Sequence, residues 1–182
     1  MVDLDSRWIF TLAVAAVACE RLVELVVSRR HERILRGRGA VEVGASHYPW
    51  MVALHTSFLA AGPLEAWLFG RPFIPWLGWI AAAVVAATMA LRYWTIRTLG
   101  TRWTTRVLVL SEAPLVEGGP FRWLRHPNYL AVALELFALP LIHGAYGTAL
   151  IWGILNLWLL KVRISIEDHA LRGASPSAVK VF

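Results

Sequence analysis

Apolar residues gather in four stretches that are long enough, or nearly so, to cross a lipid bilayer as helices. Each helical residue rises 1.5 Å, so about 30 Å of hydrocarbon needs about 20 mostly apolar residues. The stretches are Trp8–Val27, Trp50–Phe69, Phe73–Leu91 and Thr148–Ile164. A fifth, Leu130–Ile142, has 13 residues, and the turn His143–Tyr146 joins it to its successor. The pattern predicts an all-α integral membrane protein of about five transmembrane helices, the last two forming a short hairpin.

Composition favours a membrane protein over a soluble one. Hydrophobic residues make up 58% of the 182 residues and charged residues 16%, against about 25% charged residues in soluble domains. The net charge is +6, but so apolar a chain with 10 tryptophans does not suit nucleic acid, which needs a solvated cationic face. The single Cys19 excludes an internal disulfide and a cysteine-based metal cluster. We therefore expect one membrane domain that binds neither nucleic acid nor metal.

Lys and Arg residues are concentrated at one end of the predicted spans. Fifteen of the 18 lie in the 28–49 loop, the 92–127 segment and the C-terminal end: Arg29, Arg30, Arg33, Arg36, Arg38, Arg92, Arg97, Arg102, Arg106, Arg122, Arg125, Lys161, Arg163, Arg172 and Lys180. Five spans with the N-terminus outside place all fifteen on the cytoplasmic face, whereas four spans would divide them. This bias predicts a cytoplasmic C-terminus, and the same basic face would also contact anionic lipid headgroups.

Ionisable residues inside the predicted spans are candidates for function, because charge is costly in lipid. Glu20, Arg21 and Glu24 lie near the cytoplasmic end of the first span, and Arg21 can reach Glu24 at i+3. A structural ion-pair cluster and a direct role in a site are both open. Glu135 lies deeper in the fourth helix and is predicted to be a buried hydrogen-bonding partner or a gate. Glu65, near the outer end of the second span, is expected to be solvated.

The segment Gly118–Tyr129, with the sequence GGPFRWLRHPNY, precedes and opens the fourth helix. Pro127 suits the first turn of a helix, where its missing N–H is not needed. His126 would then stand at the N-cap, where free N–H groups and Arg125 favour a carboxylate or another anion. Tyr129 presents a ring and a hydroxyl from the first turn. The alternative interpretation, a basic cap that contacts lipid phosphates, is about equally supported by these residues alone.

Asn156, Arg163 and Glu167 form a polar stripe on the otherwise apolar fifth helix, because they are spaced by seven and four residues. Such a stripe must face protein or an aqueous cavity, since facing lipid would be costly. Arg163 and Glu167 can pair at i+4, and this ion pair is one explanation of the stripe. The other is a site shared with His126 and Tyr129, because the short hairpin places the two cytoplasmic helix ends side by side.

The motif Arg125-His126-Pro127-x-Tyr129, a hydrophobic hairpin and then Arg163-x-x-x-Glu167-Asp168 together resemble the isoprenylcysteine carboxyl methyltransferase family. The signature of that family is R-H-P-x-Y, a hydrophobic region and a Glu-Glu pair. R-H-P-x-Y alone also occurs in membrane sterol-reductase-like proteins, so the combination carries the resemblance, over about residues 99–171. The first part of the chain resembles a bacterial branch found beside type III polyketide synthases, whose members methylate phenolic or pyrone lipids. Its matching residues are Glu20-Arg21-x-x-Glu24, Ser28-Arg29, Gly39-Ala40-Val41-Glu42 and Ser46-His47-Tyr48-Pro49.

The resemblance implies a single membrane methyltransferase domain over residues 1–182, with three helices in 1–91 and the cofactor and catalytic region in 92–182. It implies S-adenosylmethionine as methyl donor on the cytoplasmic side of a bacterial inner membrane, and an amphiphilic, lipid-like acceptor that enters from the bilayer. Arg163 and Glu167 would be the catalytic pair, and Glu24 and Glu135 are candidates for substrate binding. The cofactor pocket would be formed by Gly119, Phe121, Arg125, His126, Tyr129 and Asn156.

The acceptor class decides what the polar pair does. A carboxylate is already a nucleophile and needs only a cation such as Arg163 to orient it, whereas a phenol or enol must lose a proton to Glu167 or His126. The chain departs from the family pattern in two places: Asp168 replaces the second Glu, and residues 172–182 lack the usual aromatic ending. Two other functions stay open. One is a sterol-type reductase using NADPH, which the Arg-Glu-Asp ending disfavours; the other is a non-enzymatic lipid-binding membrane protein.

Overall fold

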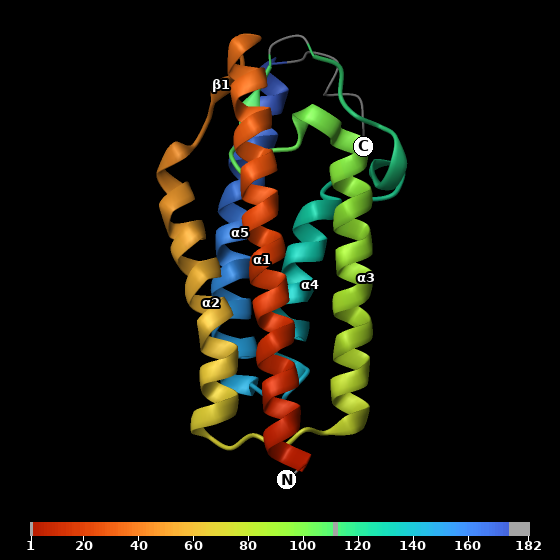
Figure 1. The fold of residues 1–182 in the computed structure, drawn as a ribbon. Coiled ribbons are helices and arrows are strands. Elements are labelled where there is room, and N and C mark those ends of the chain that lie inside the picture. Colours follow the sequence, from red (N-terminus) through yellow and green to blue (C-terminus); the bar gives the residue numbers. More distant parts are fainter. Residues whose placement is uncertain (1, 111–112, 175–182) are drawn as a thin grey trace.

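The computed structural model describes residues 2–110 and 113–174, and within them the chain forms an elongated bundle of five α-helices (Figure 1). Short 3₁₀ turns, η1 (Ala45–His47), η2 (Gly100–Arg102) and η3 (Gly119–Arg122), lie in the connections. The predicted all-α class and the C-terminal hairpin are confirmed. Lys180 and most of the atypical tail lie outside the described residues. The helices are α1 (Val2–Gly37), α2 (Tyr48–Leu68), α3 (Pro75–Leu99), α4 (Pro127–Leu141) and α5 (Tyr146–Ala174).

Three helices extend well beyond the apolar stretches that predicted them, and α5 continues ten residues past Ile164 to Ala174. α1 continues ten residues past Val27 to Gly37, and α3 continues past Leu91 to Leu99. The interpretation of 28–49 as a loop is therefore wrong for its first ten residues. Hydropathy marks the part of a helix that suits lipid, whereas Arg, Glu and Leu continue a helix readily outside it. The polar ends of α1 and α3 thus project beyond the apolar part of the bundle.

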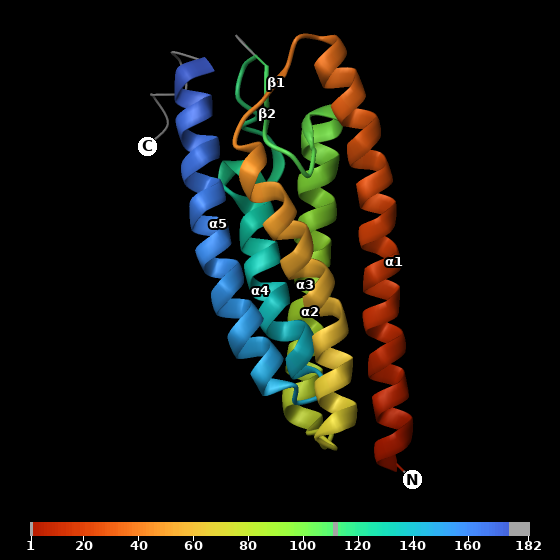
Figure 2. The same cartoon turned by 90° about the vertical axis from the view of Figure 1, so that its left-hand side faces the viewer.

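A two-stranded antiparallel sheet joins the connections that follow α1 and α3. Strand β1 (Val41–Glu42) pairs with β2 (Leu108–Val109) in the register Val41↔Val109 and Glu42↔Leu108. The sheet lies at the end of the bundle where α1, α3 and α5 finish and α4 begins (Figures 1 and 2). Strands of two residues leave no hydropathy pattern, so this sheet could not be predicted from the sequence. It brings the N-terminal half of the chain over the ends of α4 and α5.

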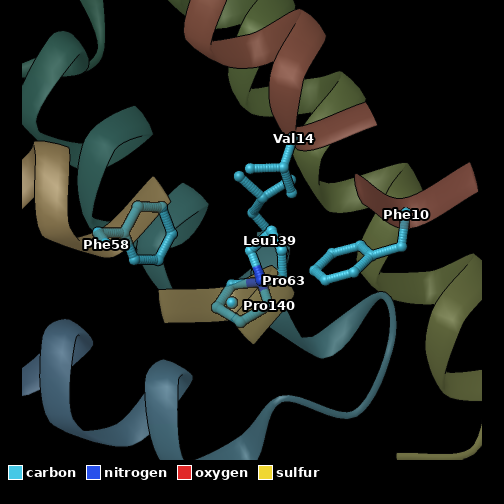
Figure 3. Close-up of a pocket in the computed structure, with 7 residues that line it drawn as sticks. Phe10, Val14, Phe58, Pro63, Leu139 and Pro140 are labelled. Carbon is cyan, nitrogen blue, oxygen red and sulfur yellow. The ribbon is translucent and has the colours of Figure 1, made fainter. Parts of the chain in front are cut away.

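The apolar core receives side chains from all five helices, and one part of it lies between α1, α2 and α4. Phe10, Val14, Phe58 and Leu139 are buried and converge on a small recess next to Pro140 (Figure 3). The recess is too narrow to admit water, so these side chains pack directly against one another. This part of the core holds α1 against α2 and α4 in the half of the bundle that contains the N-terminus.

Exposed apolar side chains and buried charges give the molecule the character of a membrane protein. Trp79 on α3 is 70% exposed and Trp158 on α5 is 66% exposed, whereas Arg163 is 6% exposed. By length and composition α3, extended to Arg102, and α5, to Arg172, can cross a membrane, and α4 is apolar but shorter. Large exposed apolar surfaces on a monomer mark contact with lipid or another protein. The number of spans and the side on which each terminus lies remain predictions.

Glu65 is not solvated as expected, but caps the N-terminus of α5. It is 8% exposed and accepts hydrogen bonds from the Thr148 N–H at 2.6 Å, the Gly147 N–H at 3.0 Å and the Thr148 hydroxyl at 2.9 Å. Nη2 of Arg71 lies 3.1 Å from Oε1 of Glu65, the oxygen that also accepts from Gly147. A carboxylate at a helix N-terminus is favoured by the unpaired N–H groups and the helix dipole. The contact joins α2 to α5 at the end of the bundle opposite the sheet.

Candidate active site

The hydroxyl of Tyr129 connects the two predicted catalytic residues. Pro127 opens α4 and His126 is its N-cap, as predicted, so Tyr129 projects from the first turn and is buried against α5. Arg163 Nε donates to the Tyr129 oxygen at 2.8 Å, and the Tyr129 hydroxyl donates to the Glu167 carboxylate. The predicted direct ion pair between Arg163 and Glu167 at i+4 is therefore not formed, because the Tyr129 hydroxyl oxygen lies between the two side chains. The predicted stripe on α5 does face protein.

Arg163 is a buried cation, and its hydrogen-bond partners among the described residues are all neutral. Besides Tyr129, its Nη1 donates to the Met51 sulfur at 2.7 Å and its Nη2 to the Thr105 carbonyl oxygen at 2.8 Å. Its guanidinium carbon lies 5.4 Å from the centroid of the Tyr129 ring. Buried charges in proteins are normally paired with an opposite charge, and a thioether is a weak acceptor. The arrangement suits a guanidinium that binds an anion from outside the chain.

Asp168 joins the end of α5 to the start of α4. Its Oδ1 lies 3.1 Å from Nη2 of Arg125 and 3.2 Å from Nε2 of His126. The His126 ring stacks on Tyr129, with ring centroids 5.4 Å apart and planes inclined by 26°. The Arg125 side chain is half exposed, at 50%. The residue that replaces the second Glu of the family pattern thus fixes the two residues before Pro127.

Asn156 is fully buried on α5, about two turns before Arg163. Within the part of the chain that the structure describes, neither its amide oxygen nor its amide nitrogen has a hydrogen-bond partner. Native proteins satisfy most buried polar atoms, and an amide offers both donors and an acceptor. The pattern is that expected of a side chain that binds a polar ligand.

Gly119 and Phe121 lie in η3 over the end of α3, away from the bonds that join Arg163, Tyr129 and Glu167. Gly119 has φ +56°, and a Cβ there would lie 2.3 Å from the Thr98 hydroxyl oxygen. Glycine is required at this turn for both reasons. Packing thus explains Gly119 by itself, and a cofactor role for either residue stays a prediction.

Glu24 and Glu135 belong to a second polar cluster, which joins α1, α3 and α4. Glu24 accepts two hydrogen bonds of 2.6 Å from Arg92 and one of 2.8 Å from Arg21. Arg21 also lies 2.9 Å from Glu20 and 3.5 Å from Glu135. The structural ion-pair interpretation is confirmed. Arg92, which the charge count assigned to the basic face, is 9% exposed and bound to Glu24, so its charge is not part of a solvated surface.

This second cluster is separate from the Arg163 site. Glu135 stands six residues after Tyr129 on α4, which is about 9 Å along the helix axis. The structure therefore does not bring Glu24 or Glu135 to the predicted catalytic pair, and their role in substrate binding remains a prediction. Two residues that do contact Arg163, Met51 and Thr105, left no signal in the sequence. Met51 contacts Arg163 through its thioether sulfur, and Thr105 contacts it through its backbone carbonyl.

At the sheet end of the bundle, burial and neighbouring charges shift the pKa values of His47 and Glu42, among others. Burial and the nearby Arg163 cation lower the pKa of His47, so this imidazole is neutral near pH 7. For Glu42, burial raises the pKa, but hydrogen bonds from Arg106 and Arg36 outweigh it, and the pKa falls below its ordinary range. Glu42 therefore stays ionised and holds the connections after α1 and α3 together.

Comparison with known proteins agrees with the motif. Residues 79–173 match the isoprenylcysteine carboxyl methyltransferase (ICMT) family. The chain is 39% identical over 164 residues to "Uncharacterized protein YpbQ" of Bacillus subtilis (strain 168), covering 90% of this chain and 96% of that protein. It is 30% identical over 165 residues to an "Uncharacterized protein" of Haemophilus influenzae, covering 90% and 95%. The narrower resemblance to a polyketide-associated branch stays a prediction. The family match and the R-H-P-x-Y site at the start of α4 show that the chain belongs to the isoprenylcysteine carboxyl methyltransferase family of membrane methyltransferases.

Proposed function

We propose that this protein uses S-adenosylmethionine to O-methylate an amphiphilic, lipid-like acceptor, and that Arg163 binds the anionic oxygen of that acceptor. The observation that carries the proposal is the buried Arg163 guanidinium, whose acceptors are a phenol, a thioether and a backbone carbonyl. An acceptor carboxylate or phenolate would supply the missing negative charge. It would also form charge-assisted hydrogen bonds, which are stronger than those to neutral groups.

Met51 marks the position at which the acceptor oxygen would bind. Its sulfur accepts a hydrogen bond from one N–H of Arg163, whereas oxygen atoms of Tyr129 and Thr105 accept hydrogen bonds from two other N–H groups of the same side chain. Sulfur is the weakest of these acceptors, and the unbranched methionine side chain moves easily. An incoming anionic oxygen would therefore displace Met51 rather than Tyr129 or Thr105. Arg163 would remain fixed by its two oxygen partners while it orients the acceptor.

The residues at the start of α4 and on α5 fit S-adenosylmethionine chemically. Asn156 offers a buried amide with an unsatisfied donor and acceptor, which suits the adenine edge or the ribose hydroxyls. Arg125 at the N-terminal end of α4 suits the carboxylate. When bound, the cofactor supplies the electrophilic methyl group. Methyl transfer then depends mainly on holding donor and acceptor in line, at about 3–3.5 Å.

Glu167 has a role that depends on the acceptor. With a carboxylate acceptor no proton is released, and Glu167 orients Tyr129, which in turn orients Arg163. With a phenol or enol, a proton must leave the acceptor oxygen, and the Tyr129–Glu167 pair offers a carboxylate to receive it. The geometry thus supports the same Arg163 contact for either acceptor class.

A product assay tests the proposal. Purified protein in detergent would receive labelled S-adenosylmethionine together with an isoprenylated cysteine, a long-chain alkylresorcinol or an alkylpyrone, and products would be identified by mass spectrometry. We expect a methylated product from at least one acceptor, and its near-complete loss in Arg163→Lys. Arg71→Lys is the matched control, because Arg71 pairs with Glu65 at the opposite end of the bundle. Absence of product with all acceptors, together with no binding of S-adenosylhomocysteine, would refute the proposal.

A further inference from the structure

The Thr105 carbonyl that binds Arg163 belongs to an irregular segment, so something outside that segment must hold it in place. Nη2 of Arg163 donates to this oxygen at 2.8 Å. Thr105 lies between η2 and β2, where no helix or strand fixes the backbone. A misplaced carbonyl would let the guanidinium rotate, and about 1 Å of misplacement at a catalytic group can cost about 100-fold in rate.

Ser28 on α1 holds Thr105 by both its backbone and its side chain. Ser28 is fully buried, and its Oγ accepts a hydrogen bond of 2.8 Å from the Thr105 N–H. The same Oγ lies 3.0 Å from the Thr105 hydroxyl and donates to Glu32 at 2.8 Å. All the hydrogen-bonding capacity of a serine hydroxyl, one donor and two acceptor positions, is therefore used.

The direction of each hydrogen bond follows from Glu32. An ionised carboxylate can only accept, so Ser28 gives its single proton to Glu32. The Thr105 hydroxyl must then donate to Ser28, which leaves its oxygen to accept from the Tyr48 hydroxyl at 3.3 Å. A chain of aligned hydrogen bonds thus runs from Tyr48 through Thr105 and Ser28 to Glu32. Such a chain permits one orientation of Thr105.

Neighbouring hydrogen bonds hold the rest of the segment between η2 and β2 in place. His31 on α1 binds the Trp103 carbonyl oxygen at 2.8 Å, and the Val43 N–H donates to the Val107 carbonyl at 3.0 Å. These bonds fix the two ends of the segment, and Ser28 fixes the residue that contacts Arg163. The last turns of α1 therefore form the support for one of the Arg163 contacts.

We propose that Ser28 is a positioning residue for Arg163, acting through Thr105. Ser28 lies outside residues 79–173, so the helix that completes the site lies beyond the part that matches the family. The proposal rests on the proposed role of Arg163 in binding the acceptor. Ser28→Ala would leave the Thr105 N–H and hydroxyl without their buried acceptor. Around metal ligands, loss of a supporting partner lowers activity by about 10- to 100-fold, and we expect kcat/KM to fall by a similar factor here.

A double-mutant cycle separates positioning from general destabilisation. Because Arg163→Lys retains only residual turnover, kcat/KM in that background is measured at raised enzyme concentration. We expect the loss caused by Ser28→Ala to disappear there, because a lysine does not make the same contact with Thr105. Thr88→Ala is the matched control: Thr88 is 2% exposed, and among the described residues its hydroxyl bonds to a carbonyl of its own helix and to nothing else. An equal fold loss in both backgrounds would overturn the proposal.

An NMR measurement gives a readout that does not need activity. In protein labelled with ¹⁵N-arginine, the Nε–H signal of Arg163 is assigned by its loss in Arg163→Lys. We expect this signal to shift or broaden in Ser28→Ala and to stay unchanged in Thr88→Ala. Ser28→Cys keeps the shape with a weaker acceptor and should show a smaller change in the same direction, which tests the proposal if the alanine variant does not fold.

The two proposals fail in different ways. If the protein methylates no acceptor but the Arg163 signal responds to Ser28→Ala, the proposed function fails and the positioning contact stands. If methyl transfer occurs but Ser28→Ala and Ser28→Cys leave both kcat/KM and the Arg163 signal unchanged, Ser28 is not a positioning residue.

Discussion

Replacing Tyr129 by phenylalanine removes the one oxygen atom that separates Arg163 from Glu167. The ring that stacks on His126 and lies beside Arg163 is kept, so the packing of α4 on α5 should change little. What is lost is the hydrogen bond from Arg163 Nε and the hydrogen bond to Glu167. The variant therefore tests whether the phenol holds the guanidinium in position.

The magnitude follows from the charged groups involved. A hydrogen bond to a charged group contributes about 1.5–3 kcal/mol, and each factor of ten in rate corresponds to about 1.4 kcal/mol. Loss of the Arg163 bond should therefore lower kcat/KM by about 10- to 150-fold. Without the intervening oxygen Arg163 can also pair directly with Glu167 at i+4. An acceptor would then compete with Glu167, so we expect KM for the acceptor to rise.

The assay is methyl transfer at saturating S-adenosylmethionine over a range of acceptor concentrations. Tyr146→Phe serves as the control, because Tyr146 is 40% exposed and lies at the opposite end of α5. Thermal unfolding of both variants shows whether the bundle is intact. Wild-type values of kcat and of KM for the acceptor in Tyr129→Phe would refute the role of the phenol in holding Arg163.

Four further changes test other parts of the structure. Arg163→Lys should lose most turnover, because a point charge cannot make the forked contact of a guanidinium; a wild-type rate would contradict that role. His126→Ala should weaken binding of S-adenosylhomocysteine in calorimetry and leave KM for the acceptor nearly unchanged. Glu24→Gln should lower the free energy of unfolding by about 3–5 kcal/mol, because it removes the carboxylate that is hydrogen-bonded to the buried Arg92. The lowered pKa of Glu42 contributes stability that is present above its ordinary value of 4.5 and is lost as pH falls through the folded-state pKa. The free energy of unfolding should accordingly fall less at acidic pH in Glu42→Gln than in the wild type. The same pH profile in both proteins would exclude this contribution of Glu42.

Local features made the helices and the start of α4 predictable. Hydropathy identified the central part of each helix, because a long apolar run has few stable structures other than a helix. Pro127 placed the start of α4 because proline is tolerated in the first helical turn and not later. Hydropathy could not find the ends of α1 and α3, since Arg and Glu continue a helix after the apolar run stops.

The helical class, the C-terminal hairpin, the R-H-P-x-Y motif at the helix start and the polar stripe on α5 can be read from the amino-acid sequence, because each depends on residues close together in the chain. Which of these residues meet depends on how the helices pack. The tertiary structure placed the Tyr129 oxygen between Arg163 and Glu167, and it moved Glu24 and Glu135 to a separate cluster with Arg92. The Thr105 carbonyl and its support on α1 could not be predicted, because every residue carries a carbonyl and only folding selects the one that is used.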